Sequence, residues 1–481
     1  MTLERKIFSN SAINIVCNIL SVALKFLAIY LIINYFSSDK ESFGKYTFIT
    51  SFITILSIII DLGVNSITIR EISNNRSLLD HYLSNAIVLK IALGFIVYIL
   101  SIVIILVFHY FQPSKYNNLI IGLVAFSSLT FFILALSQSF EMLFRIELKM
   151  IFVGIANVVG GLVFFLTTYF FIKKGYQLSS FIFNWVLMFF IIMFLLLIFT
   201  LGRFKFSFKV DFTLIKKIFL LALPLGLSAA FGFIYYRIDT IMLSWFKGDE
   251  SVANYGVAHK FVEISDIIPA SLMVVVFPLM SRFYKEDINK LKILYRRSID
   301  WMLLLGFPMA VIVSMNSDKF ILIFRQQYLV AHPALRILIW AAFMTFPGHI
   351  LGSMIIALHR QRAYPIITGL GVIINVTLNL ILIPKFDFIG AAITAFITEL
   401  IMLSLFLFVV YKAIGESVLL SSLFRYIFAS GLIGVIIYGC RIYDVNIFKI
   451  LIICIIVYGL ILLLMRDDSL KGLIRMIKES F

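Results

Sequence analysis

Residues 9–36 read SNSAINIVCNILSVALKFLAIYLIINYF, an apolar run in which Lys25 is the one charged residue. A helix needs about 20 mostly apolar residues to cross the hydrocarbon core of a membrane. The run is long enough for such a crossing, and it therefore predicts a membrane-spanning helix at the start of the chain.

Similar runs recur along the whole chain. They lie near residues 9–36, 44–67, 84–108, 118–140, 150–172, 178–200, 218–246, 252–281, 299–316, 334–356, 364–384, 388–411, 423–440 and 446–465. The ten-residue alternating segments typical of a membrane β-barrel are not visible. The sequence thus predicts an all-α polytopic membrane protein with about 14 transmembrane helices.

The composition excludes several other classes of protein. The chain has 481 residues, of which 62% are hydrophobic and 14% are charged, whereas soluble proteins carry about 25% charged residues. A soluble enzyme, a secreted disulfide scaffold and a disordered chain are therefore excluded. The three Cys and six His are scattered without metal-ligand spacing, so no metal site, cofactor or catalytic residue is predicted.

The net charge of +16 is interpreted against membrane topology. With the N-terminus inside, 25 of the 41 Lys and Arg residues fall in inner segments and 11 in outer loops. This surplus predicts a multi-pass protein of the cytoplasmic (inner) membrane with both termini cytoplasmic. The basic clusters Arg203–Lys217 and Arg282–Arg297 are expected to bind anionic membrane lipids, and no nucleic-acid partner is predicted.

A weak internal repeat indicates two halves. Ile7 begins the first run and Ile218 the seventh, and a cation follows at similar depth in each, Lys25 after 18 residues and Arg237 after 19. Parallel repeats are common in transporters. We expect a six-helix lobe over 1–210, a second over 211–415, and accessory helices 13 and 14 with a cytoplasmic tail over 416–481.

One face of the first predicted helix is polar. Asn10, Asn14, Asn18, Ser21 and Lys25 follow one another at spacings of 4, 4, 3 and 4 residues, which places them on one side of a helix. Such a stripe is expected to line an aqueous cavity. Hydrogen bonds between helices would also explain the three Asn and the Ser, but not Lys25.

The seventh and eighth predicted helices form a hairpin with charges at equal depth. Asp239 is level with Lys260, and Arg237 is level with Glu263. Arg237 and Asp239 lie about 200° apart around their helix, so both pairs cannot occupy one seam. The charges either neutralise each other and hold the hairpin together, or serve a substrate or an ion.

Two further carboxylates are candidates for titration or cation binding. Asp266 lies just before Pro269 and has no basic partner at its depth, and Glu399 lies in the middle of the twelfth predicted helix. Asp61, near the inner end of the second helix, is expected to be interfacial. Pro224 is one of several prolines that can kink a span.

An ordered set of segments gives the chain a family resemblance. It comprises Asp61-Leu62-Gly63 with Arg70-Glu71-Ile72, Arg237–Leu243 with Asn254–Ala258, and Asn375 and Asn379 with Ile383-Pro384 and Ile389–Ile393. In this order they resemble the polysaccharide repeat-unit flippases, the Wzx-type O-antigen translocases of the MATE-like exporter superfamily for multidrug, oligosaccharidyl-lipid and polysaccharide substrates. The likeness extends to about residue 411. Asp387 departs from it, because the family more often has Gly there, which puts the local turn geometry in question.

The resemblance implies a fold and a cargo. The fold would be two six-helix lobes around a central cavity plus two C-terminal helices. The cargo would be an undecaprenyl-pyrophosphate-linked oligosaccharide of O-antigen, lipopolysaccharide or capsule type, moved from the inner to the outer leaflet. A polysaccharide polymerase and a chain-length regulator would be partners.

The residues fit that cargo. Lys25 and Arg237, with Lys260 third, are expected to bind the pyrophosphate, because an unpaired buried charge costs several kcal/mol. Asp239, Glu263, Asp266 and Glu399 are the coupling or paired carboxylates, with coupling to H⁺ or Na⁺.

Other activities compete with this interpretation. A drug/cation antiporter of the same superfamily should have an acidic, aromatic cavity, whereas cations at least match acids in these spans. An exporter of another lipid-linked sugar and a flippase for the peptidoglycan precursor are chemically closer. A membrane-embedded polymerase or ligase should carry a long outer loop, and the predicted outer loops are short. The chain is thus predicted not to be an enzyme.

Overall fold

The computed structural model describes residues 3–202, 210–416, 420–443 and 445–465; for 3–15, 225, 228 and 420–422 it describes the backbone alone. Over these ranges the regular structure is helical. Twelve helical segments are long and apolar enough to span a membrane, and a bent pair at 212–247 makes thirteen. Helix α15 contains two helices on either side of Asp387, and counting both gives fourteen. The predicted all-α polytopic fold is confirmed.

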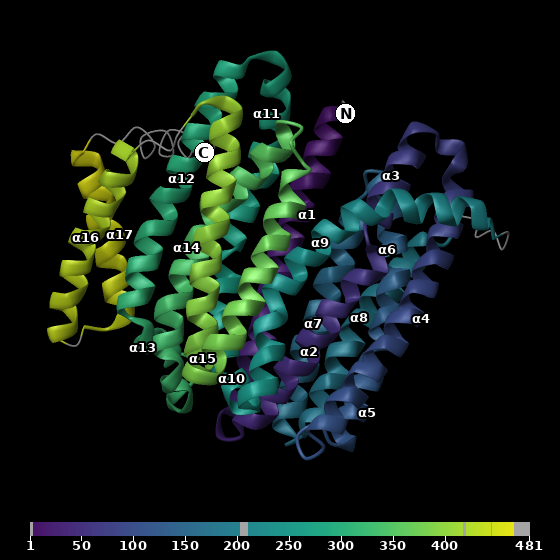
Figure 1. The fold of residues 1–481 in the computed structure, drawn as a ribbon, viewed down its shortest axis with the longest axis horizontal. Helices are drawn as coiled ribbons and strands as arrows, with labels where there is room; N and C mark the ends of the chain where they lie inside the picture. The colour runs from purple at the N-terminus through teal and green to yellow at the C-terminus, as the bar shows by residue number, and fades with distance from the viewer. Residues whose placement is uncertain (1–2, 203–209, 417–419, 444, 466–481) are drawn as a thin grey trace. The chain divides into compact units, whose positions relative to one another are not determined.

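In the residues that the structure describes, the first compact unit, Met1–Ala253, contains nine α-helices and the start of a tenth. They are α1 (Leu3–Tyr35), α2 (Lys40–Asp61), α3 (Val64–Asn74), α4 (Leu79–Phe111), α5 (Asn118–Ser127), α6 (Thr130–Ile146), α7 (Ile151–Lys173), α8 (Leu178–Thr200) and α9 (Phe212–Lys247). Short 3-10 helices lie at Phe36–Ser38 and Arg76–Leu78. Helix α9 is grouped with this unit because it packs on α2, α3 and α4 (Figure 1). The lobe boundary at residue 210 rests on the repeat and stays a prediction.

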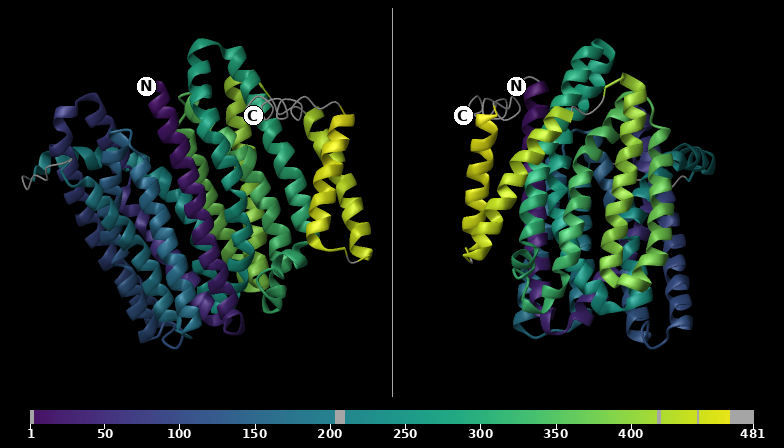
Figure 2. Two further views of the ribbon diagram at one scale, coloured as in Figure 1. Left: turned by 180° about the vertical axis from the view of Figure 1, so that it is seen from behind. Right: turned by 60° about the vertical axis from the view of Figure 1, so that its left-hand side comes forward.

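The second compact unit, Asn254–Phe481, begins within α10 (Asp249–Ser265). Its helices are α11 (Ile267–Glu286), α12 (Ile288–Met315), α13 (Ser317–Ile321), α14 (His332–Ala357), α15 (Ala363–Ile414), α16 (Leu420–Ile442) and α17 (Ile447–Leu464). A 3-10 helix at Gln326–Ala331 precedes α14. Helix α14 packs on α11, α12 and α15, and α16 packs on α12 and α17 (Figure 2).

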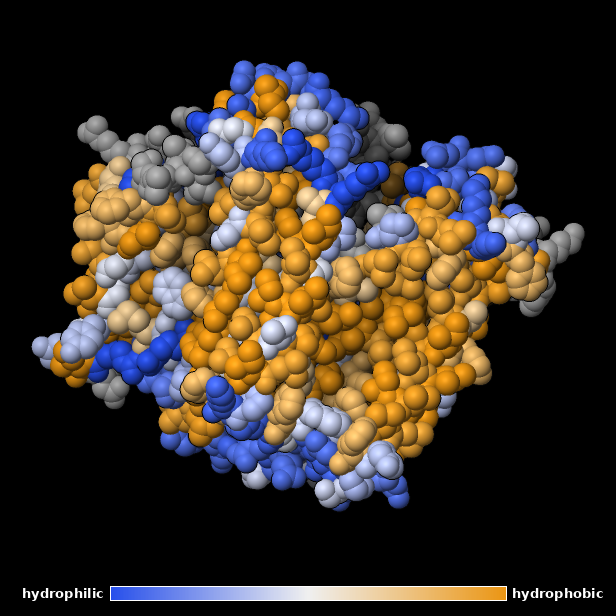
Figure 3. Space-filling model, in the orientation of Figure 1, coloured by the Kyte–Doolittle hydropathy of each residue, from blue (hydrophilic) through white to orange (hydrophobic). Residues whose placement is uncertain are grey.

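The surface of each unit has the character expected of helices in lipid. On the face that Figure 3 shows, side chains midway along the helices are mostly apolar, and hydrophilic residues gather at the helix ends. Exposed apolar side chains include Phe95 and Ile96 on α4, and Ile452 and Ile455 on α17. Lipid chains solvate such side chains without the penalty that water imposes, so the exposed apolar surface is compatible with a membrane protein.

A break between α2 and α3 lets α9 approach closely. Leu62 and Gly63 have positive φ angles of 37° and 84°, which end α2 and turn the chain into α3. A Cβ atom at Gly226 of α9 would lie 2.3 Å from the Leu62 carbonyl oxygen. Near this contact α9 bends by 60° between Phe212–Pro224 and Ala229–Lys247. The kink predicted at Pro224 is confirmed.

The first half of α9 is fixed to the end of the unit where α3 and α4 meet. The Asp211 carboxylate caps the helix by accepting hydrogen bonds from the Thr213 hydroxyl and from the backbone N–H groups of Thr213 and Leu214, and these bonds hold its pKa below the usual range. The Asp211 N–H donates to Asn85 of α4 at 2.8 Å. Leu214, Ile218 and Ala222 complete an apolar cluster with α3, α4 and α6. This half of α9 is therefore held by both polar and apolar contacts.

Asp387 occupies the turn in the middle of α15. Its φ of 55° and ψ of −141° lie close to a backbone region that almost only Gly adopts. The turn is tight, because a Cβ atom at Gly390 would lie 2.3 Å from the Leu382 carbonyl oxygen. The doubt that the sequence raised about this turn therefore has a physical basis, because this chain holds Asp387 in a strained backbone conformation.

Helices α16 and α17 are tied to the second unit at several points. The Arg441 guanidinium donates to both carboxylate oxygens of Asp318 on α13, at 3.1 and 2.7 Å, and to the Met315 carbonyl. The Tyr458 hydroxyl of α17 donates to the Leu304 carbonyl of α12 at 3.0 Å. The last two helices are thus attached by specific polar contacts as well as by packing.

Candidate functional site

The polar residues of the stripe on α1 have different surroundings in the structure. The side chains of Asn10 and Asn14 lie outside the described residues. Asn18 is exposed. Ser21 is only 2% exposed, and its hydroxyl donates to the Asn157 carbonyl of α7 at 2.9 Å. The expectation that Ser21 lines a cavity is therefore corrected, because its hydroxyl serves an interhelical contact.

Lys25 lies one turn beyond Ser21 and is half-buried. Among the residues whose side chains are described, none forms a hydrogen bond or an ion pair with its ammonium group. An ionisable group inside a span is costly and usually faces a bundle interior or water. Lys25 can therefore accept an anionic ligand without first breaking a contact to the described part of the protein.

Arg237 lies in the second half of α9, beyond the bend at Pro224. It is half-buried, and its guanidinium lies 5.2 Å from the centre of the Tyr236 ring. Asp239, two residues further on, is 5% exposed. The bend places Arg237 on a different helix axis from the basic residues at the start of α9, and the Tyr236 ring is close enough to attract its positive charge.

Lys260 has a carboxylate partner on its own helix. Its ammonium group lies 2.7 Å from Glu263, and the His259 ring nitrogen lies 3.5 Å from the other oxygen of the same carboxylate. Lys260 is therefore already partnered, in contrast to Lys25. The predicted pairs of Asp239 with Lys260 and of Arg237 with Glu263 would join the two units and stay predictions.

Asp266 has a partner that the hairpin geometry did not reveal. The Oδ1 atom lies 2.9 Å from Nε2 of His349 on α14, and the Thr345 hydroxyl lies 3.5 Å from the same oxygen. The prediction that Asp266 has no basic partner at its depth is wrong, because it compared α10 and α11 only with α9. The spacing of His349 in an apolar run gave no signal of this contact, and His349 was missed.

Glu399 lies in the second half of α15 and interacts electrostatically with Tyr364 at the start of the same helix. The turn at Asp387 brings these two halves together. Nearby on α15, Asn375 and Asn379 are fully buried, and the Asn379 amide donates to Asn375 at 2.9 Å. Two buried amides of the second unit are thus hydrogen-bonded to each other, while Tyr364 and Glu399 are half-buried.

A buried lysine in the first unit was missed by the sequence reasoning. Lys90 of α4 is 0% exposed, and its ammonium group contacts three oxygens, those of Asp61 at 2.9 Å, Asn65 at 2.8 Å and Gln138 at 2.9 Å. Asp61 was expected to be merely interfacial, and this is corrected. The one available signal was a single charge near the start of the apolar run 84–108.

The comparisons with known proteins agree with this architecture. The family model described as polysaccharide biosynthesis protein matches residues 7–284, which is more than half of the chain. The chain belongs to the polysaccharide biosynthesis protein family. A second model, described as MatE, matches residues 224–381. The predicted resemblance to polysaccharide exporters of this superfamily is confirmed.

Three curated relatives support the assignment. The capsular polysaccharide biosynthesis protein CapF of Staphylococcus aureus is 23% identical over 81% of this chain and 95% of its own length. An uncharacterized membrane protein of Methanocaldococcus jannaschii is 31% identical over 39% of this chain, and the probable low-salt glycan biosynthesis flippase Agl15 of Haloferax volcanii is 24% identical over 34%. These last two matches span 38% and 36% of the relatives' own lengths.

Solved structures share the fold. The inward closed conformation of the lipid II flippase MurJ superposes with a TM-score of 0.77 at 16% identity, covering 96% of this chain and all of that one. A multidrug resistance MATE family transporter in an inward-facing conformation superposes with a TM-score of 0.67 at 14% identity, covering 83% and 99%. Family membership and apolar helices together identify a multi-pass membrane protein.

Proposed function

We propose that this protein is a flippase that moves an undecaprenyl-pyrophosphate-linked oligosaccharide repeat unit, of O-antigen or capsule type, from the inner to the outer leaflet of the cytoplasmic membrane. The observation that carries the proposal is Lys25, a half-buried cation within an apolar helix that no described side chain neutralises. A pyrophosphate that leaves water needs such a partner, because transfer of an unpaired anion to an apolar environment is costly.

Arg237 supplies a second positive charge for the same cargo. It lies beyond the bend in α9, with its guanidinium 5.2 Å from the centre of the Tyr236 ring. Arg forms two parallel hydrogen bonds to phosphate, whereas Lys acts as a point charge. We assign Lys25 and Arg237 to the pyrophosphate, with Lys260 third.

The wider arrangement belongs to the same proposal. Two six-helix lobes would enclose a central cavity that opens alternately to the two sides, with both termini cytoplasmic and transport coupled to an ion. A polymerase and a chain-length regulator would use the product. The relatives named for capsular polysaccharide biosynthesis and glycan flipping support a role in moving a polysaccharide precursor.

The experiment is deletion of the gene followed by analysis of surface polysaccharide and lipid-linked intermediates. We expect loss of polymer, with complete repeat units accumulating on undecaprenyl pyrophosphate in the inner leaflet. Lys25→Ala should fail to restore polymer, since one charge-assisted contact contributes about 1.5–3 kcal/mol, which is roughly a 10- to 100-fold change in affinity. Lys25→Arg should restore it in part.

Lys149→Ala is the matched control. Lys149 is an exposed lysine that pairs with Glu147 in the turn between α6 and α7, and its loss should leave polymer unchanged. Normal polymer in the deletion strain would refute the flippase. Repeat units that reach the outer surface but stay unpolymerised would indicate a polymerase instead.

A drug/cation antiporter is the second candidate, because the MatE model matches residues 224–381. Such a transporter binds cations, and the cation at Lys25 would oppose them electrostatically. Increased sensitivity of the deletion strain to cationic drugs, with unchanged surface polymer, would favour it over the flippase.

A further inference from the structure

Helix α10 ends at Ser265 and α11 begins at Ile267, so that Asp266 lies at a break between two helices. The two helices together form one apolar segment, Asp249–Glu286, and the break falls near its middle. Asp266 precedes the first turn of α11, where the free backbone N–H groups favour a negative charge. A carboxylate thus lies deep within a membrane span at an interruption of the helix.

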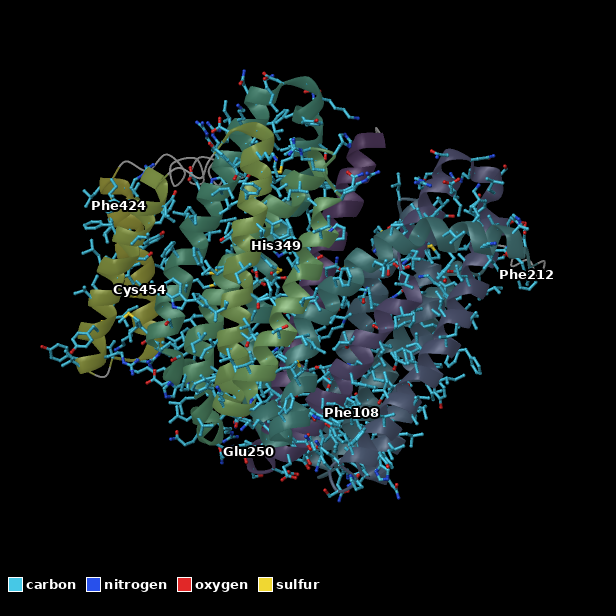
Figure 4. The ribbon with its side chains drawn as sticks, in the orientation of Figure 1. Phe108, Phe212, Glu250, His349, Phe424 and Cys454 are labelled. Atoms are coloured by element: carbon cyan, nitrogen blue, oxygen red, sulfur yellow. The ribbon has the colours of Figure 1, made fainter. Side chains whose placement is uncertain are left out.

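His349 reaches this carboxylate from α14. Its Nε2 atom lies 2.9 Å from Oδ1 of Asp266, and Thr345, one turn earlier on α14, contacts the same oxygen at 3.5 Å. Pro347 lies inside α14 beside Gly348, where a Cβ atom would meet nothing within 4 Å. Figure 4 shows His349 among the helices of the second unit, away from their ends.

The pair is accessible rather than sealed. The side chains of His349 and Asp266 are 33% and 37% exposed. Ionisable groups inside a membrane almost always face a protein interior or a water-filled space. A proton can therefore reach the pair without unfolding of the helices around it.

Other ionisable groups lie on the elements around the pair. On α10, Glu263 is held by Lys260 and His259, and on α11 Arg282 pairs with Glu286. The others are Tyr284 and Lys285 on α11; Lys290, Lys292, Tyr295, Arg296, Arg297 and Asp300 on α12; Asp318 and Lys319 on α13; His332 and Arg336 on α14; and Tyr364, Lys385, Asp387, Glu399, Tyr411 and Lys412 on α15. Within the described part of the chain, the hydrogen bonds and the ion pair of His349 and Asp266 join them to each other and to Thr345.

We propose that Asp266 and His349 form a proton-binding site that couples transport to a proton gradient. The inference rests on the proposed flippase function and names its coupling ion. Histidine changes its charge between about pH 5 and 8. Binding of a proton from water to the imidazole makes the pair an imidazolium–carboxylate pair without net charge, and release of the proton leaves one negative charge at the break between α10 and α11.

This change of charge alters the strength of the contact between α11 and α14. The neutral pair is stabilised by a charge-assisted hydrogen bond that links α11 to α14. After release of the proton, the carboxylate keeps a neutral imidazole and the Thr345 hydroxyl as its polar neighbours. Protonation thus strengthens the contact between α11, which follows the break at Asp266, and α14, which contains Pro347. A proton can in this way favour one of two conformations of the transporter over the other.

The first test measures proton binding directly on the full chain in lipid nanodiscs, by NMR of ¹⁵N-labelled histidine across pH 5–8. The signal that His349→Gln removes should titrate in this range. In Asp266→Asn its midpoint should move to lower pH, because the variant lacks the carboxylate that contacts the imidazole. His359→Gln, the control in the turn after α14, should leave this midpoint unchanged.

The opposite results overturn the proposal. A His349 that keeps one charge from pH 5 to 8, or a midpoint that Asp266→Asn does not move, would show that the pair is not a proton site. Should His349→Gln not fold, single Gln substitutions of the other five histidines assign the His349 signal by elimination.

The second test separates coupling from the proposed function. Proteoliposomes are loaded with an undecaprenyl-pyrophosphate-linked oligosaccharide, and its translocation is measured with and without a pH gradient. Wild type should respond by about tenfold per pH unit for one coupled proton, and both His349→Gln and Asp266→Asn should lose this response. An equal response in the variants would refute the coupling site alone. No translocation by wild type would refute the flippase, while the NMR titration still decides the proton site.

Discussion

Replacement of Lys90 by Met tests how much the buried cluster in the first unit stabilises the protein. The Lys90 side chain is 0% exposed and its ammonium group contacts three oxygens from α2, α3 and α6. Met is of similar length and apolar, so the substitution removes the charge and the three donors with little change in volume. It leaves the Asp61 carboxylate and two amide oxygens without their shared partner.

The expected loss follows from the burial of each group. Removal of one partner of a buried ion pair costs about 3–5 kcal/mol. Asp61 is 27% exposed, so water can solvate part of its remaining charge. We therefore expect the free energy of unfolding to fall by the lower end of this range, about 3 kcal/mol. For a unit of this size the melting temperature should fall by about 6 °C or more.

The assay is thermal unfolding of the detergent-solubilised full chain, followed by tryptophan fluorescence. Lys149→Met is the matched control, because Lys149 pairs with Glu147 at 2.9 Å and is 47% exposed. An exposed pair contributes at most about 1 kcal/mol, so this control should shift the melting temperature little. The double variant Lys90→Met with Asp61→Asn should recover part of the loss. Equal melting temperatures for Lys90→Met and Lys149→Met would refute the reasoning.

Three further substitutions test features of the backbone and of the last helices. Asp387→Gly should raise the melting temperature, since it relieves strain of about 1–3 kcal/mol, whereas Asp387→Ala should not; equal effects would show that the φ angle is not the cause. Gly226→Ala should destabilise by about 2 kcal/mol, because its Cβ atom would lie 2.3 Å from the Leu62 carbonyl oxygen, and an unchanged melting temperature would disprove that close approach. Arg441→Met leaves Asp318 without its two-oxygen contact, so hydrogen exchange should accelerate in α16 but not in α1, and an unchanged rate in α16 would argue against a specific attachment.

The positions of the spans could be predicted from the sequence because they depend on local properties. Each crossing needs about 20 apolar residues regardless of what surrounds them, and the described residues contain fourteen such segments when α15 is divided at Asp387. The kink at Pro224 was predictable for the same reason, since proline removes a hydrogen bond in its own helix. The question raised at Asp387 was also local, and its φ angle answers it.

The pairings of charges could not be predicted in this way. Lys90 and Gln138 are 48 residues apart, and Asp266 and His349 are 83 residues apart. Whether such residues meet depends on which helices are neighbours and how each is rotated about its axis, and hydropathy contains neither quantity. Ser21 illustrates the same limit, because a stripe on one face of a helix does not say whether that face meets water or another helix.

The sequence by itself therefore determined the class of fold, the number of spans and the family, since these follow from apolar run length and ordered motifs. Only the tertiary structure decided that Lys25 has no described partner while Lys260 has one, and that Asp266 meets His349. The physical reason is that the energy of a charge in a membrane depends on the groups within a few Å of it. Helix packing brings those groups together from distant parts of the chain.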